Sequence, residues 1–360
     1  MKKLKIAQIA PLWIPVPPQK YGGIERVVHY LTEELVRRGH DVTLFASGDS
    51  KTKAKLVSVY PRSLLKDNIS WTKPEWNLEN LAKAFSQAKE FDILHTHTDI
   101  WTVFFQETTK TPVLHTFHNP LYTEVKSHKE FPTRLKLYNR HRKTTNAVFI
   151  SKSQQKICTI KFPKDWICYN GIDTSLYKFN SKPEDHFIWV ARIDPYKGIE
   201  NAILAAEKTG VKLLLAGRLD KGRENYFKEK IKPHLGKQIK YVGELSQKEM
   251  SGFYRKAKGC LYPIEWEEPF GLVMVESMAC GTPVIAFDKG SVPEVIKDKK
   301  TGFVVPFKDK RGKKNIQGLI EAIKKIDEIK REDCKTWVEE NFSYQKMTSR
   351  YEEIYYQLIK

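Results

Sequence analysis

Short runs of β-branched and aromatic residues alternate with amphipathic helical patterns along almost the whole 360-residue chain. The first run, Leu4–Ala10, is followed by apolar residues that recur at helical spacing from Ile24 to Leu35. Parallel strands need a long crossover between them, and that crossover is usually a helix. The regular alternation therefore predicts parallel α/β architecture, with helices packed on the sheets.

One turn-rich stretch, Asn170–Asp185, interrupts the alternation, and the length of the chain suits two domains. We expect a first α/β domain over residues 1–172, a second over 173–343, and a terminal helix over 344–360. Strands are predicted at Val42–Ala46, Phe91–His95, Val113–Phe117, Ala147–Ile150 and Trp166–Tyr169, and then at Phe187–Val190, Val211–Ala216, Ile239–Val242, Gly259–Tyr262, Pro283–Phe287 and Gly302–Val305.

The chain is strongly basic, with 62 Lys and Arg against 43 Asp and Glu and a formal charge of +19. Part of the excess lies in residues 126–156, where nine basic residues meet one acid, Glu130. Such a balance favours anionic partners. The basic stretch is interpreted first as a solvated surface and next as a contact with an anionic membrane surface. No motif for nucleic-acid binding is present, so we expect no nucleic-acid partner.

The cysteines and the N-terminal residues bear on the cellular location. Five scattered cysteines form no CxxC pair, so a disulfide framework or a zinc site is not expected. Gln8 and Pro11 break the first apolar stretch, which predicts a buried strand rather than a signal peptide. No apolar run reaches the length of a spanning helix. We expect a cytoplasmic protein, and the basic stretch leaves open a place at the inner face of a membrane.

The segment Glu268–Glu276 places two acids around the start of a predicted helix. Pro269 and Gly271 punctuate the loop before that helix. The first amides of a helix have no internal partners and carry the positive end of its dipole. Gly271 removes the side chain that would hold a phosphate away from these amides. A carboxylate such as Glu276 suits a ribose diol, and the alternative interpretation is a surface loop with two solvated acids.

Two cations follow the first strand of the second predicted domain. Arg192 and Lys197 lie five residues apart across a turn. Arginine can hold a diphosphate with two parallel hydrogen bonds, and lysine adds a point charge. The alternative is an ordinary turn with surface cations.

Two glycines, Gly22 and Gly23, open the first predicted helix. Backbone amides at such a position can approach a phosphate or a sugar. The pair does not belong to a GxGxxG sequence, so a nicotinamide-binding site is not supported. A plain turn is the alternative.

Histidines stand at the ends of two predicted strands. His115 and His118 bracket the end of one, and His95 and His97 precede Asp99 at the end of another. Imidazole and carboxylate groups are competent metal ligands, so a metal site is one interpretation. We favour hydrogen bonds to a substrate or to the backbone, and we expect no metal.

Taken together, these segments resemble glycosyltransferase family 4, the retaining glycosyltransferases of GT-B fold. The resemblance covers nearly the whole chain, is strongest from Arg192 to Val305, and includes Gly290–Val295, which is similar to the family's Gly-x-Pro-Glu-Val turn. It implies two Rossmann-like domains that face each other across a cleft. The first would be the acceptor side and the second the nucleotide-sugar donor side. The helix Tyr344–Lys360 would cross back to pack on the first domain.

The resemblance also implies roles for single residues. Glu276 would bind the ribose hydroxyls of the donor, and Glu268 would hold hydroxyls of the transferred sugar. Arg192 and Lys197 would neutralise the diphosphate. His118 would lie near the reacting end of the sugar and the acceptor, and position them by hydrogen bonding. The other implied donor-binding positions are Gly22, Gly23, Gly243, Leu245, Phe270, Gly271, Leu272 and Val273.

The implied reaction moves a hexose-type sugar, with retention, from a nucleoside diphosphate sugar to a hydroxyl of an unknown acceptor. A UDP-sugar is favoured and a GDP-sugar comes next. Cations and helix-end amides would stabilise the leaving diphosphate, so we expect neither a metal nor a cofactor. Two other interpretations stay open. One is a GT-B relative that acts as a nucleotide-sugar epimerase or phosphorylase, and the other is a non-catalytic binding protein that uses the basic stretch.

Overall fold

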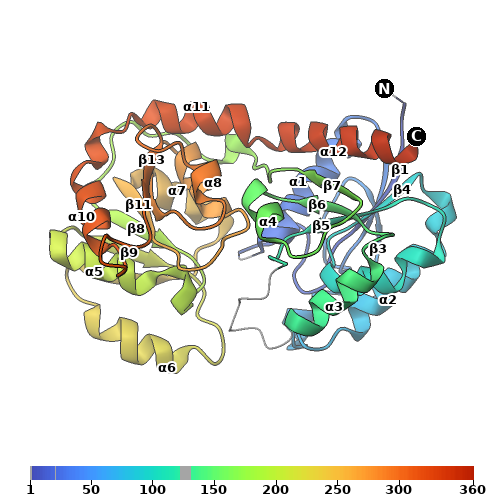
Figure 1. Ribbon diagram of the computed structural model, residues 1–360, viewed down its shortest axis with the longest axis horizontal. Helices are drawn as coiled ribbons and strands as arrows, with labels where there is room; N and C mark the ends of the chain where they lie inside the picture. Colours follow the sequence, from blue (N-terminus) through green and yellow to red (C-terminus); the bar gives the residue numbers. More distant parts are fainter. Residues whose placement is uncertain (1, 21, 122–130) are drawn as a thin grey trace. The chain divides into compact units, whose positions relative to one another are not determined.

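The computed structural model describes residues 2–20, 22–121 and 131–360. Residues 126–130 of the basic stretch lie outside the described residues. The chain divides into two compact units, each with its own sheet (Figure 1). Unit 1 comprises Met1–Gly171 and Tyr344–Lys360, and unit 2 comprises Ile172–Ser343.

The sheet of unit 1 is parallel throughout its described part, with seven strands in the order β3-β2-β1-β4-β5-β6-β7. The strands are β1 (Lys5–Ile9), β2 (Asp41–Phe45), β3 (Lys55–Val57), β4 (Ile93–Thr96), β5 (Val113–Phe117), β6 (Asn146–Phe149) and β7 (Lys164–Ile167). Alternate residues of β1 point to different faces, since Ile9 packs with Leu81 of one helix whereas Gln8 contacts Tyr355 of another.

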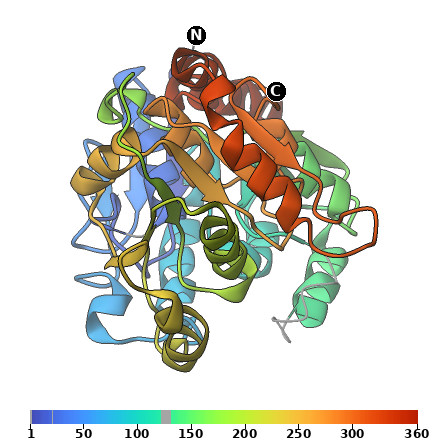
Figure 2. The same cartoon turned by 90° about the vertical axis from the view of Figure 1, so that its left-hand side faces the viewer.

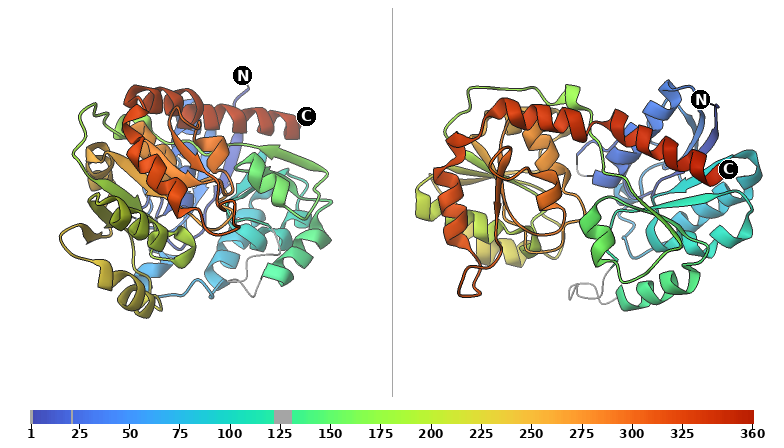
Figure 3. Two further views of the ribbon diagram at one scale, coloured as in Figure 1. Left: turned by 60° about the vertical axis from the view of Figure 1, so that its left-hand side comes forward. Right: turned by 45° about the horizontal axis from the view of Figure 1, so that its top comes forward.

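Helices cover both faces of this sheet. They are α1 (Gly23–Arg37), α2 (Glu75–Ser86), α3 (Phe131–His141), α4 (Lys152–Ile157) and α12 (Tyr344–Ile359). The predicted apolar stripe of α1, which includes Val27, Leu31 and Leu35, is buried. The last helix, α12, packs beside α1 although more than 300 residues of sequence separate them (Figure 3).

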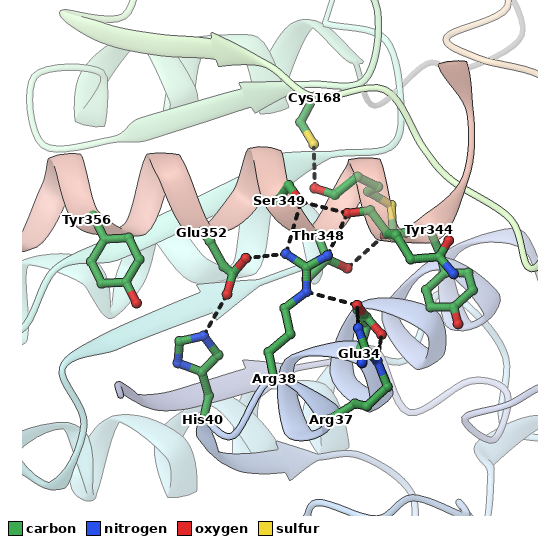
Figure 4. Close-up of polar contacts among 12 residues, drawn as sticks. Glu34, Arg37, Arg38, His40, Cys168, Tyr344, Thr348, Ser349, Glu352 and Tyr356 are labelled. Carbon is green, nitrogen blue, oxygen red and sulfur yellow. Dashed lines mark hydrogen bonds and ion pairs between the residues drawn. The ribbon is translucent and has the colours of Figure 1, made fainter. Parts of the chain in front are cut away.

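Ion pairs and hydrogen bonds connect α12 to the end of α1 (Figure 4). The Arg38 guanidinium donates to Glu34 on α1 at 2.8 Å and also to Glu352 on α12. It donates as well to the Ser349 hydroxyl at 2.9 Å, and His40 Nε2 lies 2.8 Å from the other oxygen of Glu352. Both oxygens of the buried Glu352 carboxylate thus have partners outside α12, in the segment that follows α1.

The sheet of unit 2 is also parallel in the described chain, with six strands in the order β10-β9-β8-β11-β12-β13. The strands are β8 (Phe187–Val190), β9 (Leu213–Ala216), β10 (Ile239–Gly243), β11 (Gly259–Tyr262), β12 (Val284–Phe287) and β13 (Gly302–Val305).

The helices of unit 2 form two groups (Figure 2). The helices α5 (Ile199–Thr209) and α10 (Ile316–Lys324) pack together, and α8 (Leu272–Ala279) packs with α7 (Gln247–Lys256) and α11 (Arg331–Asn341). Two short helices complete the unit, α6 (Glu224–Tyr226) and α9 (Val292–Val295).

The predicted parallel α/β class is confirmed, and the strand order shows where each sheet can bind a ligand. In unit 1 the first strand, β1, lies between β2 and β4, and in unit 2 the first strand, β8, lies between β9 and β11. The chain therefore winds in opposite directions from β1 and from β8. Ligands of such sheets bind outside the carboxyl ends of the strands at this reversal point.

Among the described residues, no helix has the length and apolarity that crossing a membrane would require.

We expect Glu352→Gln to lower the free energy of unfolding by about 2–3 kcal/mol, because it leaves Arg38 and His40 facing a neutral amide in a buried site. Glu353→Gln is the matched control, since Glu353 is 60% exposed and pairs only with Arg350 among the described residues, at 2.8 Å. The control should cost less than about 1 kcal/mol. Urea unfolding followed by tryptophan fluorescence measures both, and equal losses would contradict the assigned role of Glu352.

Candidate functional site

The carboxylate of Glu268 accepts three hydrogen bonds at the carboxyl edge of the unit 2 sheet. Its Oε2 accepts from Lys197 Nζ at 2.5 Å, from the Tyr262 hydroxyl at 2.8 Å and from Trp266 Nε1 at 2.9 Å. Its Oε1 has no hydrogen bond from any described residue. A carboxylate oxygen accepts more than one hydrogen bond, so Oε1 is available to hydroxyl groups of a ligand.

The ammonium of Lys197 has two interactions at this point. Besides its ion pair with Glu268, it lies over the ring of Trp266, 4.6 Å from the ring centroid. The Lys197 side chain is largely buried, with 17% of its surface exposed. Two residues predicted for different parts of a donor, Lys197 and Glu268, are therefore in direct contact.

The backbone of residues 267–270 is held by the turn that follows β12. Ser291 donates its amide to the Glu268 carbonyl at 2.9 Å and its hydroxyl to the Phe270 carbonyl at 2.7 Å. Gly290 packs so closely that a Cβ atom there would lie 2.3 Å from the Glu268 amide nitrogen and carbonyl oxygen. The turn Gly290–Val295 thus has a local physical role, which is to fix the loop that carries Glu268.

The helix α8 begins directly after this loop. Gly271 is its N-cap residue with φ 81°, a left-handed conformation that glycine adopts without strain. The amides of Leu272 and Val273 are among the first of the helix, where no internal acceptor is available to them. Phe270 is buried, and its ring packs against that of Phe342 with 5.7 Å between centroids. The helix start, the glycine and Glu268 therefore belong to one compact feature.

Glu276 lies about one turn inside α8 and is buried. Its Oε2 accepts the hydroxyl of Tyr254 on α7 at 2.9 Å. Burial, and then the charge of Glu276, raise the pKa of Tyr254 well above its usual value, so this hydroxyl keeps its proton. The predicted contact of Glu276 with a ribose stays a prediction.

A second group of charges surrounds the ends of β8 and β9. The half-exposed Arg192 has its Nε 3.6 Å from Asp220, and Arg218 contacts the same carboxylate at 2.5 Å. Arg223 pairs with Asp194 at 3.0 Å. The sequence interpretation missed Arg218, although it follows β9 much as Arg192 follows β8. Position after a predicted strand was the signal that could have found it.

The other residues predicted to bind the nucleotide-sugar donor lie at or near the ends of strands and helices. Gly243 is the last residue of β10, and its carbonyl accepts the Gly217 amide at 2.8 Å. Leu245 is half-buried and lies just before Ser246, which caps α7. In unit 1, Gly22 is the N-cap of α1 and Gly23 its first residue.

His118 follows β5 at the carboxyl edge of the unit 1 sheet. Its Nε2 lies 2.9 Å from Nδ1 of His97, which follows the neighbouring strand β4. Burial lowers the pKa of His118 to about 3, so the ring is neutral near neutral pH. A neutral ring accepts or donates hydrogen bonds but adds no positive charge.

The metal interpretation of the strand-end histidines finds no support in the geometry. Asp99 accepts from the Tyr138 hydroxyl at 2.5 Å and from Arg134 at 3.0 Å. His97 instead contacts His118 and Gln8. In the part of the chain that the structure describes, no group of three or more His, Cys, Asp or Glu side chains could hold a metal ion.

Two family models match the chain, one over each half. The model of Glycosyltransferase Family 4 matches residues 21–176, and that of Glycosyl transferases group 1 matches residues 176–312. Together they reach from the start of α1 to the loop after β13.

Curated relatives resemble the chain over most of its length. Glycosyltransferase MJ1607 of Methanocaldococcus jannaschii is 25% identical over 84% of this chain and 85% of its own. N-acetyl-alpha-D-glucosaminyl L-malate synthase of Bacillus anthracis is 25% identical over 94% of this chain and 95% of its own.

Solved structures share the fold at lower identity. Sucrose-phosphate synthase from Thermosynechococcus elongatus aligns with a TM-score of 0.81 at 20% identity, over 98% of this chain and 99% of its own. Anabaena HepE in complex with UDP and glucose aligns with a TM-score of 0.75 at 19% identity, over 99% of this chain and 100% of its own. The architecture of two parallel sheets with helices is therefore that of GT-B glycosyltransferases.

We expect Gly290→Ala to destabilise the protein by about 2 kcal/mol more than Gly312→Ala, because the added methyl group would overpack the Glu268 backbone. The two glycines form a matched pair, since both have positive φ (55° and 75°) but nothing lies within 4 Å of a Cβ atom at Gly312. Backbone strain alone costs about 1–2 kcal/mol at either position. Thermal unfolding of the two variants compares them, and identical losses would show that the contact with Glu268 is unimportant.

Proposed function

Because the chain belongs to glycosyltransferase family 4 and has the GT-B fold, we propose that it moves a hexose-type sugar from a nucleoside diphosphate sugar to a hydroxyl of an acceptor, with retention. The enzyme is a glycosyltransferase, and the proposal concerns its donor, its stereochemistry and its site. The observation that carries it is the Glu268 carboxylate, one oxygen of which is saturated while the other is open.

In the proposed donor complex, Oε1 of Glu268 accepts hydroxyls of the transferred sugar. Lys197 bonds the other oxygen of Glu268, and in this complex its ammonium would also contact the phosphate that is bonded to the sugar. Its ammonium has three donor hydrogens, so it can serve the carboxylate and a phosphate oxygen together. The same side chain then links the recognition of the sugar to the departure of the diphosphate.

The proposed diphosphate site combines fixed cations with backbone amides. Arg192 contributes a half-exposed guanidinium, and Leu272 and Val273 contribute amides at the start of α8. Charge grows on the leaving oxygen as the sugar departs, and preorganised donors of this kind stabilise it. Such a site needs no metal, and we propose metal-independent transfer in which the departing phosphate takes the proton of the acceptor hydroxyl. Glu276 would bind the ribose.

The nature of the base is proposed from the structural relatives. Anabaena HepE has been crystallised with UDP and with UDP-glucose, so a UDP-sugar is the first donor to test and a GDP-sugar the second. A bound donor raises the melting temperature of the protein by mass action. A thermal-shift panel of nucleotide sugars therefore identifies the donor without knowledge of the acceptor.

Two other functions give different outcomes in the same assays. A nucleotide-sugar epimerase converts its substrate without an acceptor, and a phosphorylase needs inorganic phosphate. A non-catalytic binding protein releases no nucleoside diphosphate under any condition. Release of the nucleoside diphosphate that depends on an added acceptor hydroxyl supports the transferase.

We expect Lys197→Ala to lower kcat/KM by about 30- to 1,000-fold, which corresponds to about 2–4 kcal/mol of lost transition-state stabilisation. Lys335→Ala is the control, because Lys335 lies on α11, faces Glu339 at 3.7 Å and is not among the residues proposed to bind the donor. Steady-state kinetics with the donor found in the panel measures both. Full turnover by Lys197→Ala would refute the role proposed for this residue.

We also propose that the described part of the basic stretch contacts an anionic membrane surface. Lys136, Arg140 and Lys143 are exposed on or just after α3. Phe104 is 48% exposed and packs against His141 at the end of the same helix. Exposed cations beside an exposed aromatic ring suit the headgroup region of a bilayer.

We expect the protein to sediment with vesicles that contain phosphatidylserine and to stay in solution with neutral phosphatidylcholine vesicles at low salt. The double variant Lys136→Glu/Arg140→Glu should lose this binding. Lys228→Glu/Lys232→Glu, which makes the same change of charge at exposed positions in unit 2, should keep it. Absence of wild-type binding at low salt would end the membrane proposal.

A further inference from the structure

A buried chain of polar side chains leads from the C-terminal helix α12 to His118. The Tyr355 hydroxyl lies 2.7 Å from His95 Nδ1 and accepts from Gln8 Nε2 at 2.9 Å. Gln8 Oε1 lies 3.1 Å from His97 Nε2, and His97 Nδ1 lies 2.9 Å from His118 Nε2. These links join three neighbouring strands, β1, β4 and β5, to α12 through side chains alone.

Polar side chains are unusual on the buried strands where Gln8 and His95 lie. Strands buried on both faces of a parallel sheet normally carry apolar residues. Gln8 and His95 pair directly across β1 and β4, and both are fully buried. Buried polar groups are costly unless each is satisfied. The chain of hydrogen bonds satisfies them, but a pair of apolar residues would fill the same space without that requirement.

His95 and His97, the two buried histidines inside this chain of hydrogen bonds, are neutral. Burial lowers the pKa of His95 and of His97 well below the usual histidine value, and neighbouring histidines lower it further. In a neutral imidazole one nitrogen donates and the other accepts. Each hydrogen bond in the chain therefore fixes the direction of the next one.

The direction follows from the Gln8 amide. Its Oε1 can only accept, so His97 Nε2 is the donor of that bond and His97 Nδ1 is an acceptor. The bond between His97 and His118 then requires that His118 Nε2 donate. His118 Nδ1 consequently carries a lone pair and no proton.

The other end of this hydrogen-bonded chain is consistent with this orientation of the Gln8 amide. Gln8 Nε2 donates to the Tyr355 hydroxyl, and in this arrangement that hydroxyl donates a hydrogen bond to His95 Nδ1. His95 Nε2 then donates to the Thr116 hydroxyl at 2.8 Å, and this hydroxyl lies 2.9 Å from that of Tyr351. Two tyrosines of α12 are thus partners of the chain, so the helix that returns to unit 1 also orders its polar interior.

We propose that Gln8, His97 and Tyr355 are positioning residues that hold His118 in the tautomer with a bare Nδ1, as an acceptor for a substrate hydroxyl. This inference rests on the proposed function, in which hydroxyl groups are bound and glycosylated. Among the described residues, none bonds Nδ1 of His118, and its ring stacks on that of His97 with 5.2 Å between centroids. A bare imidazole nitrogen accepts from a hydroxyl and is repelled by a phosphate oxygen, so His118 selects the sugar or acceptor and not the diphosphate.

Variants at Gln8 separate positioning from stability. Gln8→Leu removes the acceptor of His97, and we expect kcat to fall by about 10- to 100-fold, the scale of misplacing a group at the reacting centre. The thermal shift caused by UDP alone should not change, because the proposed diphosphate site belongs to unit 2. Gln8→Glu keeps an oxygen toward His97 and should restore most of the lost kcat.

The matched control is Gln106→Leu, the same change at another buried glutamine of unit 1. Gln106 bonds Thr144 at 2.8 Å and Thr145 at 3.1 Å, and among the described residues none of its hydrogen-bond partners belongs to the chain of hydrogen bonds that ends at His118. We expect this variant to lose melting temperature but to keep kcat. If Gln8→Leu and Gln106→Leu lose the same stability and both keep kcat, the positioning role is wrong.

The tautomer itself can be observed without activity. Long-range proton–nitrogen NMR of protein labelled with ¹⁵N-histidine distinguishes protonated from bare ring nitrogens, and His118→Asn identifies the His118 signals by their loss. We expect a protonated Nε2 and a bare Nδ1 in the wild type, and a mixture in Gln8→Leu and Tyr355→Phe. A protonated Nδ1 in the wild type would overturn the proposal. If the protein turns over no nucleotide sugar, the proposed function fails. The NMR result still decides which nitrogen of His118 is protonated, and therefore the direction of the hydrogen bonds.

Discussion

The return of the C-terminal helix to unit 1 is the constraint on which the rest of the structure depends. Tyr351 and Tyr355 of α12 bond groups inside the unit 1 sheet, and Glu352 joins Arg38 and His40. Unit 2 is thus inserted into the sequence of unit 1. Its two ends are adjacent, since the Ile172 amide donates to the Phe342 carbonyl at 2.9 Å. The chain can therefore leave unit 1, complete a whole second unit and return without a long linker, but unit 1 is complete only when the last helix is in place.

In unit 2 the position of Glu268 depends on contacts from several strand ends rather than on the helix α8 that follows it. Lys197 follows β8, Tyr262 ends β11, and Gly290 follows β12. Lys197 supplies a cation and Tyr262 a hydroxyl donor. Gly290 has no side chain, so the loop that carries Glu268 can pack against its backbone. An acid held on one oxygen by three donors keeps a fixed direction for the other oxygen. This preorganisation is what a site needs in order to recognise hydroxyl groups that are also well solvated by water.

The parallel α/β class and most strands could be predicted because buried parallel strands form continuous apolar runs, as in Phe187–Val190. The strand β3 was missed because it is a three-residue edge strand with the charged Lys55 and only half-buried side chains. The candidate site was predicted as separate motifs, and a single sequence could not reveal that Lys197 bonds Glu268. The histidines at strand ends were expected to bond a substrate or the backbone. Bonds to a substrate stay a prediction, but the structure adds a side-chain partner: His97 bonds Gln8 from a strand some 90 residues earlier, a pairing that no local pattern indicates.

The two units differ in the kind of polar group that they present at the carboxyl edges of their sheets. In unit 2 the edge carries guanidinium and ammonium groups, several of them paired with carboxylates at distances of 2.5–3.6 Å. In unit 1 the edge carries imidazoles that burial keeps neutral, as the lowered pKa of His118 indicates. Cations attract phosphate oxygens, whereas neutral rings with lone pairs attract hydroxyl protons. A nucleoside diphosphate sugar and an acceptor contain both kinds of group. The chemistry of the two edges therefore supports the proposal that unit 2 binds the phosphates, and that unit 1 and Glu268 bind hydroxyl groups.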